Sequence, residues 1–162
     1  MCRRHHHHQH VLVAAIALMA AFILQGVSST TNFTGYAATT AYDVLELNNM
    51  PRGLLPLGVQ SFVLDAGGAL ELTLPGECNF FVEVAGKQIK FRFDSSVSGA
   101  IRSGSISRLS GAWIQVEFAL VGFNQVSRAG DQLNFRLEKK STQSFPTSAF
   151  AESVPCSGLL AP

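Results

Sequence analysis

Histidine, the side chain most used for acid–base catalysis and metal binding, is confined to the first ten residues of this 162-residue chain. The five histidines lie between positions 5 and 10, after two arginines and before an uncharged apolar run, Val11–Leu24. A basic start, an apolar core of this length and small residues beyond it are typical of a secretory signal peptide. We predict cleavage after Ser28, with cleavage after Ser29 as a close alternative. Residues 1–28 are then the signal, and the mature chain contains no histidine.

An uncleaved membrane anchor is the main alternative for this segment. A transmembrane helix needs about 20 consecutive apolar residues, and Val11–Leu24 provides fourteen. No second long apolar run follows along the chain. We therefore expect a secreted protein that has no membrane span once the signal is removed.

Serine nucleophiles and metal sites have little support in the mature chain. A catalytic serine needs a base to activate it, and Gly104-Ser105-Ile106-Ser107 resembles a nucleophile elbow only superficially. Without histidine, a metal would depend on oxygen ligands, and no calcium-binding loop motif occurs. We predict no catalytic, metal-binding or cofactor-binding residues from these patterns.

Carboxylate pairs are the remaining route to catalysis, because two of them on neighbouring strands can divide acid and base roles. The candidates lie in or at the ends of predicted strands: Glu71, Glu83, Asp94 and Glu117. They alternate with apolar residues, which favours solvated outer faces. The interpretation that the protein is not an enzyme is therefore preferred, with a carboxylate-dependent hydrolase as the less favoured alternative.

Two cysteines remain after signal removal, Cys78 and Cys156. A redox or metal-binding pair would need closer spacing or more ligands, whereas an even pair in a secreted chain favours a disulfide. This bond would close a loop of roughly 80 residues, for which chain entropy gives about 4–5 kcal/mol as an upper figure.

Residues 29–38 are small and polar, and we expect them to form a flexible arm. They contain Asn32-Phe33-Thr34, the glycosylation sequon of this chain. An exposed sequon in a secreted protein is a reasonable acceptor. We therefore predict a glycan at Asn32, with an unused sequon as the alternative.

The charge of the mature chain is nearly balanced. Without the two arginines of the signal, ten basic residues stand against eleven acidic ones, and no basic cluster exceeds Lys139-Lys140. Binding to nucleic acid or to an anionic membrane depends on a basic stripe. We expect neither partner.

The elements that must position any site follow from the hydrophobic period. Thr40 is a predicted N-cap with Asp43 at the third helical position, and Asn48-Asn49 before Pro51 ends a short helix. A period of two then indicates strands with one buried and one wet face, which is typical of antiparallel pairing. The predicted strands are Ser61–Asp65, Leu70–Leu74, Asn79–Val84, Gln88–Asp94, Ser98–Ser107, Trp113–Phe123 and Gln132–Glu138.

About seven strands at spacings near ten residues predict an all-β antiparallel barrel or roll. We place this single domain at residues 39–157, followed by a tail at 158–162. After Lys140 the alternation decays, and Phe145 and Phe150 are expected to pin an irregular segment to the barrel.

Three aromatic residues are possible ligand-facing positions: Phe81, Trp113 and Phe123. Phe81 is the most informative, because its neighbours Phe80 and Val82 supply the inward face of their strand. Phe81 then points to the other side, where it either packs beneath the helix or the tail or faces a ligand or partner.

Short motifs recur in a definite order along the chain: Leu47–Pro56, Ser98-Gly99, Gly104-Ser105-Ile106, Leu109-Ser110-Gly111, Gly130-Asp131-x-Leu133-x-Phe135, Ser144-Phe145-Pro146, Phe150 and Pro155-Cys156. In this order and spacing, residues 40–157 resemble the plant domain of unknown function 538 family. The resemblance implies a β-barrel-like or roll fold with a short N-terminal helix, in an apoplastic protein. It carries no agreed activity and no catalytic residues.

Three functional hypotheses follow. The first is a secreted, non-enzymatic binder of a small apolar or amphipathic, lipid-like ligand, since eleven phenylalanines lie in the mature chain. The second is a structural or partner-binding module of the cell exterior, associated for instance with a cell-wall component. The third is the carboxylate hydrolase. A closed apolar cavity would favour the first, a filled interior the second, and facing carboxylates in a cleft the third.

Overall fold

The computed structural model of the protein describes residues 40–157. The predicted signal peptide, the arm with its sequon at Asn32 and the tail at 158–162 lie outside the described residues, and they stay predictions. The part that is described forms one compact β-rich unit.

The predicted helix is present as α2 (Ala41–Leu47). The Thr40 hydroxyl accepts a hydrogen bond from the Asp43 amide at 3.1 Å, and the Asp43 carboxylate accepts one from the Thr40 amide at 3.1 Å. This capping box satisfies two amides that the first turn leaves free. A 3-10 turn, η2 (Arg52–Leu54), follows. Within residues 40–157, no helix is long and apolar enough to cross a membrane.

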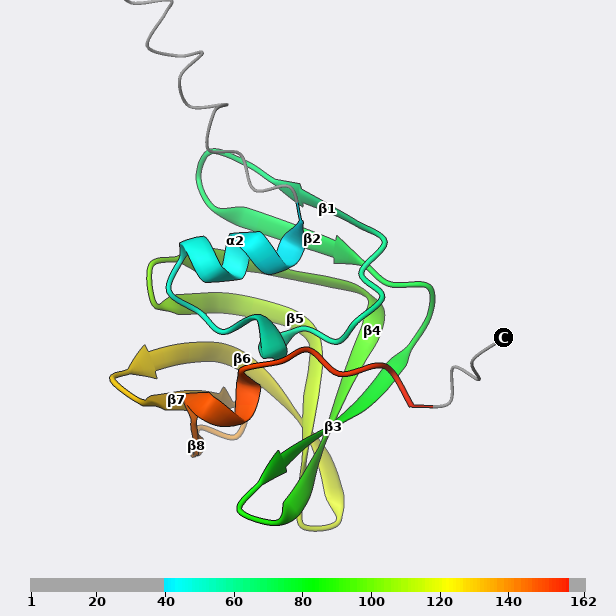
Figure 1. Ribbon diagram of the computed structural model, residues 1–162, viewed down its shortest axis with the longest axis vertical. Coiled ribbons are helices and arrows are strands. Elements are labelled where there is room, and N and C mark those ends of the chain that lie inside the picture. Colours follow the sequence, from blue (N-terminus) through cyan, green and yellow to red (C-terminus); the bar gives the residue numbers. More distant parts are fainter. Residues whose placement is uncertain (1–39, 158–162) are drawn as a thin grey trace, which may run out of the picture. The chain divides into compact units, whose positions relative to one another are not determined.

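The strands form one antiparallel sheet, in the order β1-β2-β4-β5-β6-β7-β8, with β3 paired to the free stretch of β4 (Figure 1). Their bounds are β1 (Ser61–Leu64), β2 (Ala69–Thr73), β3 (Cys78–Val84), β4 (Lys87–Arg102), β5 (Ser105–Val116), β6 (Ala119–Ala129), β7 (Gln132–Leu137) and β8 (Thr142–Pro146). The prediction of an antiparallel β domain with a short N-terminal helix is therefore confirmed.

Three of the predicted strands have the wrong boundaries. The segments expected at 88–94 and 98–107 belong mainly to one 16-residue strand, β4, whose pairing with β5 shifts register between Phe93 and Ser98. The strand expected at 113–123 is instead the end of β5 and the start of β6. Its turn escaped prediction because Glu117-Phe118 contains no glycine, proline, asparagine or aspartate, although Glu117 has a φ of 55°.

The segment after Lys140 is more regular than its sequence pattern indicates. Residues of β8 pair with β7, for example Leu133 with Phe145. A 3-10 turn, η3 (Thr147–Phe150), follows and buries Phe150. The expectation of an irregular segment was wrong for β8, whereas the anchoring role predicted for Phe150 is confirmed.

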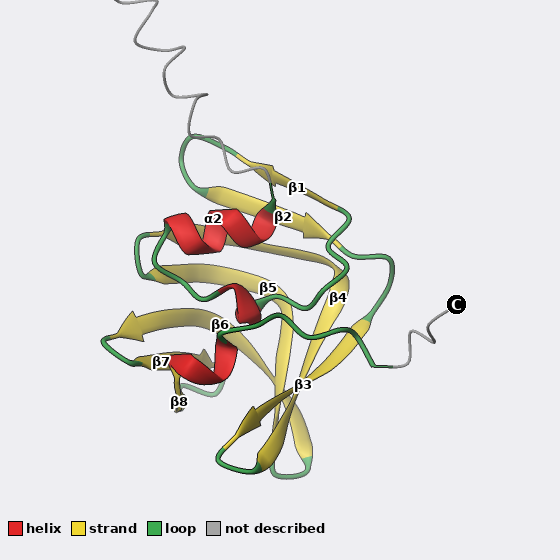
Figure 2. Ribbon diagram, viewed as in Figure 1, coloured by secondary structure: helices red, strands yellow, loops and turns green. Residues whose placement is uncertain are grey.

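The sheet coils without closing into a barrel, because β1 and β8, which end the strand order, do not pair with each other. Figure 2 shows α2, η2 and η3 lying over one side of the coiled sheet, where a closed barrel would have further strands. We call the segments 40–60 and 147–157, which carry these turns, the N-terminal and C-terminal straps.

The core lies between the sheet and the two straps. Alternation places Phe91 and Phe93 inside, and the ring of Phe80 packs between them, at centroid distances of 5.4 Å and 5.1 Å. Leu45 of α2 and Leu54 of η2 are buried on the opposite side of this core. A sheet with one apolar face is thus covered by helical turns rather than by a second sheet.

Candidate functional site

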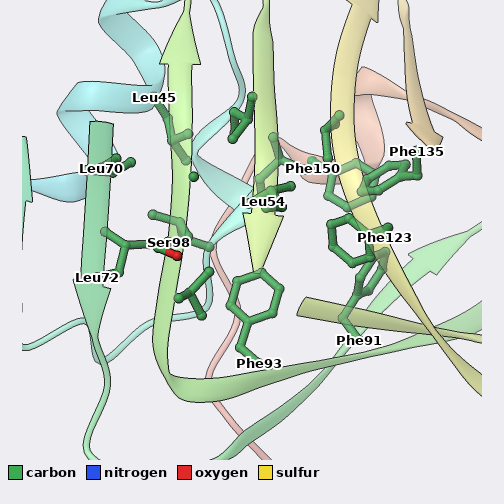
Figure 3. A pocket seen from close by; sticks show the side chains of 16 residues that line it. Leu45, Leu54, Leu70, Leu72, Phe91, Phe93, Ser98, Phe123, Phe135 and Phe150 are labelled. Atoms are coloured by element: carbon green, nitrogen blue, oxygen red, sulfur yellow. The ribbon is translucent and has the colours of Figure 1, made fainter. Parts of the chain in front are cut away.

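An apolar cavity of about 40 Å³ lies between the sheet and the N-terminal strap (Figure 3). Its walls come from α2, η2, η3 and from β2, β4, β5, β6 and β7. Six of the lining residues define its two sides: Leu45, Leu54 and Phe150 on the straps, and Leu70, Phe123 and Phe135 on the sheet.

The lining is almost free of polar groups, since Ser98 is its one residue with a polar side chain. A small cavity of this kind stays dry, because a water molecule needs two to four polar partners. Its volume suffices for one small chemical group and is well below the roughly 300–1,000 Å³ of the pockets that bind drug-sized ligands. The site is therefore apolar and small. It is intermediate between the two alternatives considered from the sequence, a closed apolar cavity and a filled interior.

A cluster of phenylalanine rings centred on Phe91 builds the sheet side of the cavity and reaches the C-terminal strap through Phe150. The centroid of the Phe91 ring lies 6.1 Å from Phe123, 5.6 Å from Phe135 and 5.8 Å from Phe150. Edge-to-face and tilted arrangements of this kind add about 0.5–1.5 kcal/mol per pair beyond burial alone. The sheet side is consequently well fixed.

The two straps are fastened to each other above the cavity. The Leu57 amide donates to the Val154 carbonyl at 2.8 Å, and the Ser153 hydroxyl donates to the Arg52 carbonyl at 2.9 Å. Gly53 packs against the backbone of the C-terminal strap so closely that a Cβ there would lie 2.6 Å from the Glu152 carbonyl oxygen. The absence of a side chain at position 53 is thus required by the contact.

The disulfide predicted between Cys78 and Cys156 is confirmed. Both cysteines are buried, and the bond ties the C-terminal strap to the start of β3. Next to it, the Ser157 amide donates to the Asn79 carbonyl at 2.6 Å. The disulfide therefore holds the end of the strap that helps to cover the cavity.

The three candidate ligand-facing aromatics do not come together. Phe123 is buried and lines the cavity, whereas Phe81 and Trp113 lie on the outer face of the sheet, on strands either side of β4. Phe81 is 39% exposed, so it does not pack beneath the helix or the strap. The Arg92 guanidinium lies over the Trp113 ring, 5.4 Å from its centroid, and pairs with Glu77 at 2.8 Å.

Three of the four candidate carboxylates lie on the outer face of the sheet or at a hairpin tip, and Asp94 is half-buried where the pairing of β4 with β5 shifts register. Pairing sets Glu71 opposite Ser98 and Glu83 opposite Gln88, and Glu117 occupies the turn between β5 and β6. The register thus sets neither Glu71 nor Glu83 opposite another carboxylate. Within residues 40–157, no three histidine, cysteine, aspartate or glutamate side chains gather as metal ligands would.

Sequence reasoning missed two features. The first is the contribution of Leu45, Leu54 and Leu70 to one cavity, since these residues come together only in the folded chain. The second is Phe118, which is fully exposed at the tip of the β5–β6 hairpin. The sequence offered one indication of Phe118: it follows the charged residue Glu117 in the middle of a segment that was predicted as a single strand.

Comparison with known proteins gives one match. The family model described as protein of unknown function, DUF538, matches residues 41–151. No curated protein and no solved structure matches the chain.

Proposed function

This chain belongs to the DUF538 family of proteins of unknown function, and we propose that its domain is a non-enzymatic binder of a small apolar or amphipathic ligand. The observation that carries the proposal is the cavity between the sheet and the straps, whose lining has hardly any polar surface. An apolar group that enters it gains burial worth about 25 cal/mol per Å² of surface removed from water.

The size of the cavity sets the mode of binding. About 40 Å³ accepts one small group, so a longer chain enters only as α2 moves away from the sheet. The sheet side is held by ring contacts and by strand pairing on both sides of Phe123. The N-terminal strap is hydrogen-bonded to the rest of the fold beyond α2, where the Gly104 amide donates to the Asn48 carbonyl at 2.7 Å and the Gln60 amide donates to the Thr73 carbonyl at 2.8 Å. The Tyr42 hydroxyl of α2 donates to Pro56, within the same strap, at 2.7 Å. We therefore expect α2 to be the moving wall, because the strap from Arg52 to Leu57 is fastened to the C-terminal strap.

Binding is favoured over catalysis by the contents of the cavity. It holds no titratable side chain, and none of the carboxylates considered for hydrolysis lines it. An apolar ligand inside would meet the Ser98 hydroxyl but no base to activate it. The site can hold a ligand without transforming it.

The proposal is tested with the secreted protein in two measurements. Organic extraction and mass spectrometry identify any apolar compound that stays bound through purification. Methyl NMR in xenon-saturated buffer then reports on the cavity, because dry apolar cavities take up xenon. We expect shifts at the methyl groups of Leu45, Leu54 and Leu70, which line the cavity.

A matched pair of variants locates the binding. Val126→Phe places a ring at a buried wall of the cavity, and Val63→Phe makes the same change at an exposed position of β1. We expect Val126→Phe to abolish both the xenon shifts and the retained compound, and Val63→Phe to preserve them. Unperturbed cavity methyl groups together with an empty extract would contradict the proposal.

A second candidate function, a partner-binding module of the cell exterior, is favoured by Phe118. Its side chain is fully exposed, and Leu120 on the same hairpin is 38% exposed. Co-sedimentation with an insoluble cell-wall polysaccharide tests this candidate. Phe118→Ser should weaken sedimentation and Leu47→Ser, at another exposed apolar position, should not; equal behaviour of the two variants removes the support.

Secretion is part of the proposal. The disulfide supports it, because such bonds persist mainly in oxidising compartments. N-terminal sequencing of protein from a eukaryotic culture medium should begin at Ser29, after cleavage behind Ser28. An intact Met1 on a membrane-held chain would overturn secretion in favour of an anchor.

A further inference from the structure

A second hollow, about 370 Å³ in volume, lies across β1, β2, β4 and β5. Its floor is made of small residues of β4, Ser98, Gly99 and Ala100. The exposed positions of β2 alternate with the buried leucines that face the core, so these outward side chains lie on the sheet face that the straps leave open. The groove shares Leu70, Ser98 and Gly99 with the lining of the apolar cavity, but it also contains charged side chains, which the cavity does not.

Opposite charges flank the floor of the groove. Asp65 and Glu71 come from the β1–β2 side and Arg108 comes from β5, with β4 between them. Among the ion pairs within residues 40–157, none joins Arg108 to either carboxylate. Neighbouring strands are about 4.8 Å apart, so β2 and β5 are separated by roughly two such spacings, which leaves room for a ligand.

The acidic side is held in place by the backbone. Asp65 Oδ1 accepts hydrogen bonds from the amides of Gly67 and Ala69, both at 2.9 Å. The turn itself is joined to β4, since the Ile101 amide donates to the Gly68 carbonyl at 2.8 Å. Asp65 Oδ2 has no hydrogen bond to any described residue. A pre-positioned carboxylate loses less side-chain entropy when it binds a ligand.

The basic side has a constrained backbone. Arg108 adopts a φ of 52°, which is uncommon for a residue with a side chain. The irregular pairing of β4 with β5 surrounds this position, where Ser98 pairs with Ser110 and Ala100 with Ser107. The extra residue in β5 re-aims the side chains around it, as bulges do near binding sites. Here it places Arg108 at the groove.

We propose that this groove binds a small zwitterion, whose ammonium group lies between Asp65 and Glu71 and whose carboxylate or phosphate lies on Arg108. The carboxylates accept N–H hydrogen bonds, and the guanidinium donates two parallel ones to a planar anion. A ligand with both charges satisfies both sides at once, whereas a simple cation or anion meets one attractive and one repulsive side.

The test is a ¹⁵N–¹H NMR titration of the secreted chain with γ-aminobutyrate. We expect saturable shifts at the amides of Glu71, Ser98 and Arg108. Putrescine and succinate, which carry only one kind of charge, should cause weaker shifts. Phosphatidylethanolamine vesicles form a separate arm: line broadening with vesicles, without shifts from γ-aminobutyrate, would assign the chemistry to a lipid headgroup and overturn the free ligand.

Two variants and a matched control complete the experiment. Arg108→Gly removes the guanidinium and suits the positive φ, and Glu71→Gln removes one charge while keeping an acceptor for the Ser96 hydroxyl. Each should weaken binding by about tenfold or more, the usual effect of losing a charged hydrogen bond. Arg136→Gln, on exposed β7, should leave it unchanged. Equal losses in all three, or no saturable shift in the parent protein, would overturn the proposal.

Discussion

The ring of Phe91 meets the ring of Phe150 edge to face, with centroids 5.8 Å apart and planes at 79°. This contact joins the longest strand of the sheet to the C-terminal strap at the centre of the core. The strap that covers the cavity is therefore fixed by a core ring as well as by the disulfide. The stability of the sheet and the closure of the cavity are coupled through Phe91.

Phe91→Ala should lower the free energy of unfolding by about 3–5 kcal/mol, because it removes a buried ring and its contacts with four other rings. Lys90→Ala, one residue away on the outer face, should change it by no more than about 0.5 kcal/mol. Denaturant melts of the two variants measure the difference. Similar costs would mean that the two faces of β4 are assigned wrongly.

Gly53→Ala should destabilise the protein by about 1–3 kcal/mol, as overpacking against fixed atoms does. The added Cβ would lie 2.6 Å from the Glu152 carbonyl oxygen, which belongs to the backbone of the C-terminal strap and cannot rotate away. Gly76→Ala is the matched control, since no atom lies within 4 Å of a Cβ there. Thermal melts should separate the two variants. A stable Gly53→Ala protein would show that the straps are loosely joined.

Replacing Cys78 and Cys156 together by alanine should lower stability by about 2–5 kcal/mol. The bond spans a sequence separation of 78 residues, so most of its effect comes from restricting the unfolded chain. Urea unfolding of the double variant and of the parent protein measures the loss. A loss below about 1 kcal/mol would contradict this account and would mean that ring and hydrogen-bond contacts hold the strap unaided.

The parts of the fold that were predictable from the sequence are those set by near neighbours. Thr40 and Asp43 form a cap three residues apart, and alternation in β4 fixes which side of the strand Phe91 faces. The strand β8 was not predictable, because its irregular sequence is ordered by pairing with β7. The apolar cavity was also beyond reach, because Leu45 meets the sheet only through the path of the whole chain.

The hairpin tip between β5 and β6 supplies the last prediction. Glu117 holds a φ of 55°, in the left-handed region, which costs a residue with a side chain about 1–2 kcal/mol. Glu117→Gly removes that strain, and the greater freedom of glycine in the unfolded chain offsets part of the gain. We therefore expect stability to be unchanged or to rise by up to about 1 kcal/mol.

Glu83→Gly is the matched comparison for this prediction, because it makes the same change inside β3, where Glu83 pairs with Gln88 in an extended strand. It should destabilise by about 0.5–1 kcal/mol, the usual cost of glycine in a strand. Denaturant melts of both variants decide the matter: a loss at Glu117 equal to that at Glu83 would mean that the turn is not strained. Unchanged or higher stability of Glu117→Gly would show that the native turn is strained. The same turn leaves Phe118 fully exposed, and strain of this kind is expected where the exposed ring serves binding.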